Sequence, residues 1–472
     1  MQESATTAVE DPFAHQGRVA ITQGELFGRQ YPQHLQELER RLADQLAACG
    51  HDSLVLTAGS ADNHLFDDQP SSFRANPHLR QWLPFDDCAG AALLLEPGRQ
   101  PELLFLQPSD YWHQPPQLPP WAAEHLQVST FTTQALLQNA LEQRIQGRNG
   151  VAMIGATRDH LIEQGHQSNP AALLAMMDYD RAQKTAFEQN CMRLATRRAV
   201  AGHRAAAQAF EAGVDAGGAT EFEIHCDYLR ASQQTESDLP YGNIVALNSH
   251  AAVLHYQHQD RRRETPTLSL LIDAGARCHG YASDITRTYS HGPGLFQDLI
   301  AALNAEQLQL IDSIAVGQNY LALHQQMHHR IAKILCDSGI LRCGADEAFE
   351  QHLTEPFLPH GLGHLIGLQT HDVAGQADRS GHTVPPPPEY AALRLTRPIE
   401  ENQVFTIEPG IYFIPMLLEP LLAGPQGHLV NAEVLSSLRE FGGIRIEDNV
   451  LVSASGVDNF TRESFAEQAT QA

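Results

Sequence analysis

The chain has 472 residues, of which 42% are hydrophobic and 18% are charged, and its formal net charge is −25. The length predicts two domains, and the acidic balance argues against nucleic acid and anionic membranes as partners. No apolar run approaches the roughly 20 residues that span a bilayer, so we expect no membrane segment.

The first residues and the cysteines indicate a compartment. Residues 1–24 lack the basic start and apolar core of a secretion signal, and we expect a flexible extension there. The seven cysteines are scattered along the chain and include no C-x-x-C pair. This usage is typical of a reduced, cytoplasmic protein.

Residues 25–177 alternate helix and strand signals, which predicts an α/β domain. Leucines at intervals of three and four residues form one helical stripe within 31–50, and Gly50 is a suitable stop. Shorter apolar runs follow, bounded by turn residues. They predict strands at 53–59, at 91–107 (as a hairpin about Pro97 and Gly98) and at 150–156, with a helix at 135–145.

Residues 178–472 begin with helices and then change to strands. A helical stretch covers 181–213, and Thr220 with Glu223 forms a capping-box pattern for the next helix. The four prolines at 385–388 indicate an extended connector. The pattern predicts a curved antiparallel sheet backed by helices, with strands at 243–256, 267–273, 280–289, 404–413 and 443–452 and one further helix over 304–339.

Two aspartates flank a short turn in LLIDAGARCHGYASDITRTY (270–289). A hairpin here would bring the carboxylates of Asp273 and Asp284 together, with cross-strand Cβ atoms roughly 5 Å apart. Like charges at that distance repel each other unless a proton or a cation lies between them. Two solvated aspartates beside a turn are the alternative, but both lie within apolar strands. The placement favours a bridging metal ion.

Two glutamates lie on apolar strands in the same way. Glu408 in VFTIEPGIYF precedes a Pro-Gly turn, and Glu447 lies within GGIRIEDNVLV. Arg445 shares a strand face with Glu447, because side chains alternate along a strand. It could form a surface ion pair of small effect with Glu447, or it could steady carboxylates that bind a metal.

Three histidines, His360, His364 and His371, lie in HGLGHLIGLQTHD (360–372), separated by glycines and apolar residues. Four carboxylates and one imidazole make a hard, oxygen-rich ligand set with enough donors for two divalent ions. Manganese suits this set better than cobalt or zinc does. Two ions about 3.5–4 Å apart would hold a hydroxide nucleophile between them at neutral pH.

The ordered set Asp273, Asp284, His364, Glu408 and Glu447 resembles the metal-binding pentad of the pita-bread metallopeptidases. Within them the chain is most similar to the bacterial Xaa-Pro dipeptidases (prolidases), a group that includes the organophosphorus acid anhydrolases. The similarity covers nearly the whole chain from about residue 25. Its motifs are FDDQPSSFRANPHLRQWLP (66–84), PSDYWH (108–113), YGNIVALNSHAAVLHY (241–256), DAGARCHGYASDITRTY (273–289), PHGLGHLIGLQTHDVAG (359–375), TIEPGIYFI (406–414) and FGGIRIEDNV (441–450).

The resemblance implies a role for each residue of the site. The pentad would bind two divalent ions, most suitably Mn²⁺, with His364 as the histidine ligand. Glu408 would carry the proton from the nucleophile to the proline nitrogen, and His371 would stabilise the oxyanion. His255 and Arg394 would hold the C-terminal carboxylate of the dipeptide. The residues implied to bind substrate are Tyr241, His255, His360, Arg394 and Arg445, with His371 also facing the substrate.

The resemblance further implies a homodimer. LFDDQPSSF (65–73) matches a loop that reaches into the neighbouring subunit's site and offers an acid to the free amine of the substrate. Asp67 or Asp68 would act across that interface, with Trp112 on the same wall. From its residues alone, the segment is a solvated loop.

The implied reaction is hydrolysis of Xaa-Pro dipeptides, with organophosphorus triesters as a side activity. Two alternatives are an aminopeptidase that cleaves longer Xaa-Pro peptides and a metal-free pita-bread module that binds peptides. Thr370 stands where an aliphatic residue is usual in the family, and Tyr289 where tryptophan is common. The other histidines are expected to be structural: His324, His328 and His329 on a solvated helix face, and His279 and His291 exposed near the hairpin.

Overall fold

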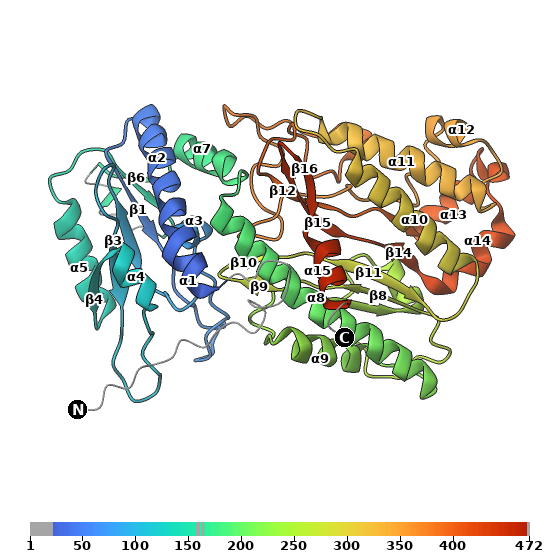
Figure 1. Ribbon diagram of the computed structural model, residues 1–472, viewed down its shortest axis with the longest axis horizontal. Coiled ribbons are helices and arrows are strands. Elements are labelled where there is room, and N and C mark those ends of the chain that lie inside the picture. Colours follow the sequence, from blue (N-terminus) through green and yellow to red (C-terminus); the bar gives the residue numbers. More distant parts are fainter. Residues whose placement is uncertain (1–21, 157–160, 163–164, 470–472) are drawn as a thin grey trace.

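The computed structural model describes residues 22–156, 161–162 and 165–469, and it shows an N-terminal and a C-terminal part lying against each other (Figure 1). Most of the extension expected at residues 1–24 falls outside the described residues. The domain boundary placed after residue 177 stays a prediction, and helix α7 (Ala171–Arg181) runs across it. Within the described residues, no helix has the length and apolar character needed to cross a membrane.

The N-terminal part is built on a six-stranded mixed sheet with the order β4-β3-β2-β1-β5-β6. The hairpin predicted about Pro97 and Gly98 is confirmed, because β2 and β3 pair in antiparallel register with Leu94 opposite Glu102. The edge strand β4 was not predicted, since its residues are only partly buried and show no alternation. The strands are β1 (Ser53–Thr57), β2 (Ala92–Leu95), β3 (Glu102–Leu106), β4 (Gln127–Phe131), β5 (Val151–Ile154) and β6 (Gln167–Ser168).

A long helical segment begins the described chain and packs against this sheet. It passes through a short π-helical turn before α2, and Gly50 ends α2 in a left-handed conformation with φ 71°. The four leucines of the predicted stripe are all buried, which confirms the predicted helix face. The helices of this part are α1 (Gln23–Glu25), the π-helix η1 (Leu26–Gln30), α2 (Tyr31–Cys49), α3 (Pro77–Trp82), α4 (Pro120–His125) and α5 (Gln134–Ile145).

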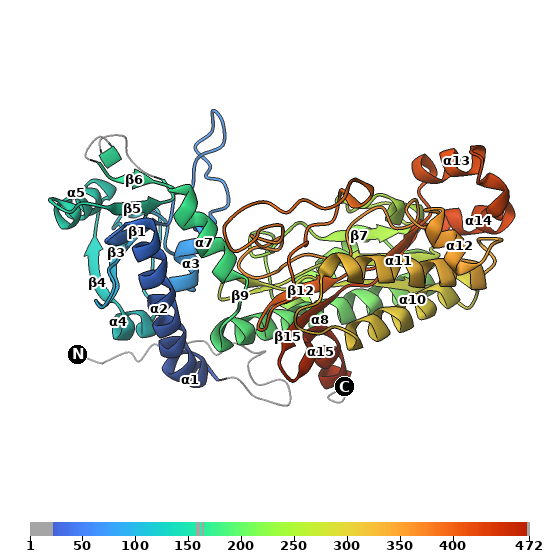
Figure 2. The same cartoon turned by 90° about the horizontal axis from the view of Figure 1, so that it is seen from above.

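The C-terminal part contains short antiparallel strands that continue one another as a curved surface, the pita-bread arrangement. Strand orders are β11-β8-β7, β12-β15-β16 and β13-β14, and an isolated bridge between Thr286 and Glu447 joins the first group to the segment after β14. Helices α8, α10 and α11 run along these strands (Figures 1 and 2). The strands are β7 (Ile244–Leu247), β8 (Ser269–Asp273), β9 (Arg277–Cys278), β10 (Tyr281–Ala282), β11 (Thr286–Ser290), β12 (Val404–Ile407), β13 (Gly410–Tyr412), β14 (Gly443–Arg445), β15 (Asp448–Ser453) and β16 (Gly456–Asn459).

The strand predicted over 243–256 is wrong after residue 247, because a 3-10 turn (Asn248–Ala252) follows β7. Two of the predicted helices also differ from expectation. Helix α8 begins after Thr185, where a capping box with Glu188 fixes its start, rather than at residue 181. The single helix predicted over 304–339 is wrong, because Gly317 has φ 88° and Asn319 caps a second helix through Leu321 N. The helices are α8 (Ala186–Asp215), α9 (Glu221–Ser232), α10 (Leu295–Asp312), α11 (Tyr320–Asp337), α12 (Ala345–Glu350), α13 (Pro415–Ala423), α14 (Ala432–Leu438) and α15 (Phe460–Ala469), with 3-10 turns at Asn248–Ala252, Pro388–Tyr390, Gly427–Leu429 and Arg439–Phe441.

His324 and His328 of α11 are buried, so the prediction that they lie on a solvated helix face is wrong. His324 and His328 are each 1% exposed, and their Nε2 atoms lie 3.2 Å apart. Nδ1 of His328 bonds to Thr354 Oγ1 at 2.9 Å, and the ring of His324 meets that of Tyr390 edge to face. Burial lowers the pKa of His324 to about 2 and that of His328 to about 4, so both imidazoles are neutral. Of the others, His329 and His291 are exposed as expected, and His279 is half-buried.

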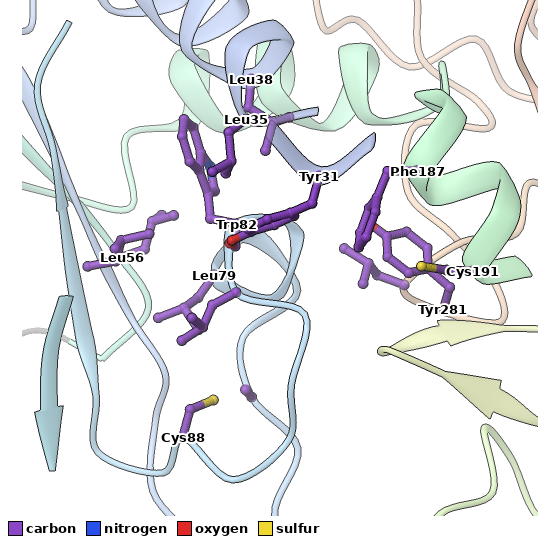
Figure 3. Close-up of a cluster of buried hydrophobic side chains, with 14 of the residues drawn as sticks. Tyr31, Leu35, Leu38, Leu56, Leu79, Trp82, Cys88, Phe187, Cys191 and Tyr281 are labelled. Carbon is purple, nitrogen blue, oxygen red and sulfur yellow. The ribbon is translucent and has the colours of Figure 1, made fainter. Parts of the chain in front are cut away.

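The two parts share one apolar core. Figure 3 shows Tyr31 of α2 close to Phe187 of α8, with Cys191 and Tyr281 behind Phe187. The ring centroids of Tyr31 and Phe187 are 5.3 Å apart, and the Tyr31 hydroxyl donates to the Trp82 carbonyl at 2.6 Å. Side chains from both parts therefore bury each other, and this contact fixes the N-terminal part beside the curved sheet.

Candidate active site

A cavity of about 650 Å³ lies between the two parts. One wall is the segment 74–77 before and at the start of α3, and the others come from the hairpin 273–284, from residues 240–257 and from the segment 368–371. The volume lies within the roughly 300–1,000 Å³ typical of small-molecule sites. Asp273, Asp284, Tyr241, His255 and His371 all line it, so the structure brings five of the predicted site residues to one cavity.

The predicted hairpin brings the two aspartates together. Strands β8 and β11 pair in antiparallel register with Asp273 opposite Thr286, and Asp284 lies just before β11. The hydroxyl of Tyr241 is 2.7 Å from Asp273 Oδ1 and 2.5 Å from Asp284 Oδ1. A phenol carries one proton and can donate to only one of these oxygens. The second contact therefore requires another proton or a cation between the carboxylates.

His364 completes a compact group of ligand atoms with Asp284 and Glu447. One candidate ligand atom from each of the three lies within 4.8 Å of the others. His364 Nε2 is 3.4 Å from Asp284 Oδ2 and 3.7 Å from Glu408 Oε1. Its Nδ1 is 3.0 Å from the Leu365 carbonyl, which places a proton on Nδ1 and turns Nε2 toward the carboxylates.

The charges of this group fit a bound cation. Burial raises the pKa of Glu408 to about 7, although the nearby His364 acts to lower it. Burial, together with repulsion from Asp284 and Glu408, raises the pKa of Glu447 well above its usual range. Burial likewise raises the pKa of Asp273. Asp284 differs, because hydrogen bonding to His364 overcomes burial and lowers its pKa. Neighbouring carboxyl groups repel each other when all of them are ionised, and divalent ions bound among them stabilise the ionised form.

Arg445 is buried inside the site, so a surface ion pair with Glu447 is excluded. Its Nη2 donates to Asp273 Oδ2 at 2.8 Å, its Nη1 to the Tyr412 hydroxyl at 2.9 Å, and its Nε to Thr286 Oγ1 at 3.2 Å. Thr286 in turn donates to Glu447 Oε2 at 2.8 Å. Arg445 therefore holds Asp273 directly and Glu447 through Thr286.

His360 is held by a chain that includes a tyrosine the sequence analysis missed. Its Nδ1 is 2.8 Å from the Gly361 carbonyl, and its Nε2 is 2.8 Å from the Tyr412 hydroxyl. Because Arg445 donates to that hydroxyl, the tyrosine proton is directed to His360 Nε2. Burial and Arg445 lower the pKa of His360 to about 3, so the ring is neutral. Tyr412 lies on β13, four residues after Glu408, and this closeness in sequence to a predicted ligand was the available signal.

Asn449 is a second residue that the sequence analysis missed. Its side-chain amide donates to the Asp284 carbonyl at 2.7 Å, and its Oδ1 accepts from the Asp284 N–H at 3.2 Å. Asn449 thus fixes the backbone of Asp284 although its own side chain is not a candidate ligand. Its position two residues after Glu447, on the same strand face, was the signal.

Three predicted substrate residues lie near one another, and two of them, His255 and His371, line the cavity. His371 packs edge to face on His364, with ring centroids 4.5 Å apart, and its partial burial together with His364 and Arg394 lowers its pKa to about 4. His255 lies in the same cavity lining as His371. Thr370 lies beside His371 in the cavity wall, whereas Arg394 is exposed and does not line the cavity.

Asp67 and Asp68 do not line the cavity of their own chain. They lie on a loop between β1 and α3 that projects from the body, drawn in blue in Figure 2. The adjacent Leu65 and Phe66 are 84% and 100% exposed, and Trp112 on another loop is 75% exposed.

Comparison with known proteins agrees with this geometry. Residues 190–454 match the model of metallopeptidase family M24, and residues 29–179 match the Xaa-Pro dipeptidase N-terminal domain. The Xaa-Pro dipeptidase of Aeromonas hydrophila is 42% identical over 445 residues, which is 93% of this chain and 99% of that protein. That of Edwardsiella ictaluri is 43% identical over 440 residues, covering 92% of this chain and 98% of that protein.

Solved structures support the fold alone. The aminopeptidase PepP of Pseudomonas aeruginosa superposes with a TM-score of 0.68 at 21% identity, covering 92% of this chain and 98% of that one. Zinc-substituted aminopeptidase P of E. coli, solved with product, gives 0.67 at 19% identity, covering 93% and 98%. With the full-length relatives above, these matches show that the chain belongs to metallopeptidase family M24, within the group of the Xaa-Pro dipeptidases.

Proposed function

We propose that this metallopeptidase hydrolyses Xaa-Pro dipeptides with two divalent ions bound by Asp273, Asp284, His364, Glu408 and Glu447. The observation that carries the proposal is the convergence of four buried or half-buried carboxylates and one Nδ1-protonated histidine beside a cavity of about 650 Å³. Bound ions would supply an activated hydroxide at neutral pH and polarise the scissile carbonyl. Manganese suits the oxygen-rich ligand set best.

Each protein group has a distinct task in this proposal. Glu408 accepts the nucleophile's proton and delivers it to the proline nitrogen, because it is the ligand that lies closest to His360, with Oε2 3.8 Å from His360 Nδ1. His371 is neutral at neutral pH and donates a hydrogen bond to the developing oxyanion. Arg394 and His255 bind the substrate's C-terminal carboxylate, and Tyr241 and Arg445 keep the metal-binding aspartates in place.

A panel of Xaa-Pro dipeptides assayed with and without added Mn²⁺ tests the proposal. We expect turnover of Ala-Pro and Leu-Pro, none of Pro-Ala, and a loss after chelation that Mn²⁺ restores. Metal analysis of protein purified without chelator should give up to two ions per chain. A metal content well under one ion, with no Mn²⁺-restored activity, would favour the metal-free peptide-binding module instead.

An aminopeptidase acting on longer peptides is the second candidate, and it uses the same chemistry. Ala-Pro and Ala-Pro-Ala separate the two, because a dipeptidase must bind the carboxylate directly after proline. Faster cleavage of the tripeptide would overturn the dipeptidase assignment. Hydrolysis of organophosphorus triesters is proposed as a side activity of the same ions, and release of nitrophenol from a nitrophenyl phosphotriester measures it.

We also propose a homodimer in a reducing, cytoplasmic compartment. The projecting loop supports the dimer, since Leu65 and Phe66 at its tip are almost fully exposed and gain apolar burial only against another surface. In that assembly Asp67 or Asp68 reaches the partner's cavity and binds the substrate ammonium. The seven cysteines are all free thiols, which supports a reducing compartment.

A further inference from the structure

Two arginines, Arg74 and Arg277, line the active-site cavity. Arg277 lies on β9, opposite Ala282 of β10, and Arg74 approaches from the N-terminal part just before α3. Both belong to the lining that also contains Asp273 and Asp284. A group bound between the two arginines would therefore share one cavity with the metal-binding carboxylates.

Neither guanidinium is neutralised by a carboxylate in the described parts of the chain. Arg74 donates to two carbonyl oxygens, Leu239 O at 2.7 Å and Pro240 O at 2.9 Å. These bonds anchor the side chain but do not neutralise its positive charge. The Arg277 guanidinium has no hydrogen bond or ion pair to any residue from 22–156 or 165–469. An arginine has five N–H donors, so both side chains retain free donors for a ligand.

The acids that influence Arg277 are already engaged elsewhere. Asp86 forms an ion pair with the buried Arg80. Asp238 accepts from the backbone N–H of Thr235 at 2.8 Å and from its hydroxyl at 2.7 Å. Arg277 is half-buried, and leaving such a cation without a counter-ion is costly.

The electrostatic balance around Arg277 points the same way. Burial, together with the nearby Arg80 and Arg74, lowers the pKa of Arg277 to about 10, so it stays protonated at neutral pH but under repulsion. An anion placed between Arg74 and Arg277 would relieve that repulsion. If that anion is a carboxylate, a guanidinium can bind it through two parallel N–H groups.

The geometry points to a subsite in which Arg74 and Arg277 bind the acidic side chain of the residue before proline. This inference rests on the proposed function, in which Arg394 and His255 take the C-terminal carboxylate. A dipeptide with a neutral side chain has no second carboxylate for Arg74 and Arg277 to bind. Glu-Pro and Asp-Pro have one, and their α-ammonium group can face the acids of the cavity.

The test compares isosteric dipeptides, Glu-Pro with Gln-Pro and Asp-Pro with Asn-Pro, so that only the side-chain charge changes. We expect kcat/KM of wild type to favour the acidic member of each pair. Arg277→Gln should reduce the Glu-Pro to Gln-Pro ratio by about tenfold or more, the effect of losing one hydrogen bond to a charged group. Arg277→Lys should reduce it less. Arg230→Gln, on the exposed side of α9 and paired with Asp227, is the matched control.

Other results would overturn the subsite. The subsite is excluded if wild type has a Glu-Pro to Gln-Pro ratio of kcat/KM at or below one. It is also excluded if Arg277→Gln leaves that ratio unchanged. If Arg277→Gln fails to fold, the Arg74→Gln ratio and the ionic-strength dependence of the wild-type ratio decide, because a subsite for charge must weaken as salt rises. If no Xaa-Pro dipeptide is cleaved, the proposed function fails, and calorimetric binding of Glu-Pro against Gln-Pro still tests the subsite separately.

Discussion

Asp372, which follows His371 in the chain, forms an ion pair with Arg181 at the end of α7. Arg181 Nη2 lies 2.6 Å from Asp372 Oδ1, and both side chains are 1% exposed. Lys184 Nζ is 2.9 Å from the other oxygen, Oδ2. The segment that carries His371 is thereby tied to Arg181 and Lys184, which precede Asp372 by 191 and 188 residues in the chain.

Asp372→Asn should destabilise the protein strongly. The substitution leaves Arg181 and Lys184 buried without a counter-charge, and breaking a buried pair on one side costs about 3–5 kcal/mol. Denaturant unfolding measures the loss. Asp378→Asn, an aspartate on an exposed turn, should change stability by well under 1 kcal/mol and serves as the control. Equal stability of the Asp372 variant and wild type would show that the pair does not hold this segment.

The same aspartate predicts an acid limit to stability. Burial alone would raise the pKa of Asp372, but Arg181 and Lys184 outweigh it and lower the value from 3.8 to about 2. Because the folded-state pKa is depressed, the stabilisation is fully present above pH 4 and is lost as pH falls toward 2. The contribution is about 2 kcal/mol. Unfolding free energies from pH 5 to 2 should therefore fall more steeply for wild type than for Asp372→Asn.

Asp284→Asn should remove metal and activity together without unfolding the chain. It deletes a carboxylate charge at the centre of the ligand group, while Asn449 still holds the backbone of residue 284. Metal content per chain and circular dichroism are the two measurements. Asp346→Asn, at an exposed position, should keep both metal and activity. Full activity of the Asp284 variant would refute the ligand set.

Gly363→Ala should disrupt the site through the backbone. A Cβ at residue 363 would overlap the carbonyl oxygen of Thr406 and the hydroxyl of Tyr320, so the segment that carries His364 would have to move. We expect a loss of several kcal/mol in unfolding free energy and weaker metal binding. Gly28→Ala, where a Cβ meets nothing within 4 Å, should be neutral or slightly stabilising. Unchanged metal affinity in the Gly363 variant would contradict this explanation.

Asp67→Ala and Asp68→Ala test the projecting loop. If one of these acids binds the substrate ammonium in the partner subunit, its loss should raise KM for dipeptides several-fold while metal content stays constant. Asp62→Ala, nearer the base of the loop, should have ordinary kinetics. A fully active monomer in sedimentation, or normal KM in both variants, would reject the cross-subunit role.

The sequence predicted the parts of the site that depend on local patterns. The apolar strands around Asp273 and Asp284 and the turn between them were enough to predict the hairpin, since antiparallel pairing follows the chain order. Contacts between distant segments were not predictable in this way. Nothing in the order of residues shows that Arg445 reaches Asp273, or that Tyr412 links it to His360.

The helices show the same limit in a simpler form. The apolar pattern over 304–339 is consistent with one helix, because Gly317 and Asn319 interrupt it without breaking the periodicity. The burial of His324 and His328 depends on Thr354 and Tyr390, which belong to later segments. The capping box of Thr185 and Glu188 was readable in the sequence and would have placed the start of α8 correctly.

The core that Tyr31, Trp82, Phe187 and Tyr281 share has a consequence for engineering. Exchanging the N-terminal part between relatives would remove the side chains, such as Tyr31 and Trp82, that share this core with Phe187 of α8 and Tyr281 of β10. The recipient would then expose Phe187 and Tyr281 beside the hairpin that holds Asp284. A chimera can succeed only if both faces of this core are transferred together, so the unit of exchange is the whole chain rather than either half.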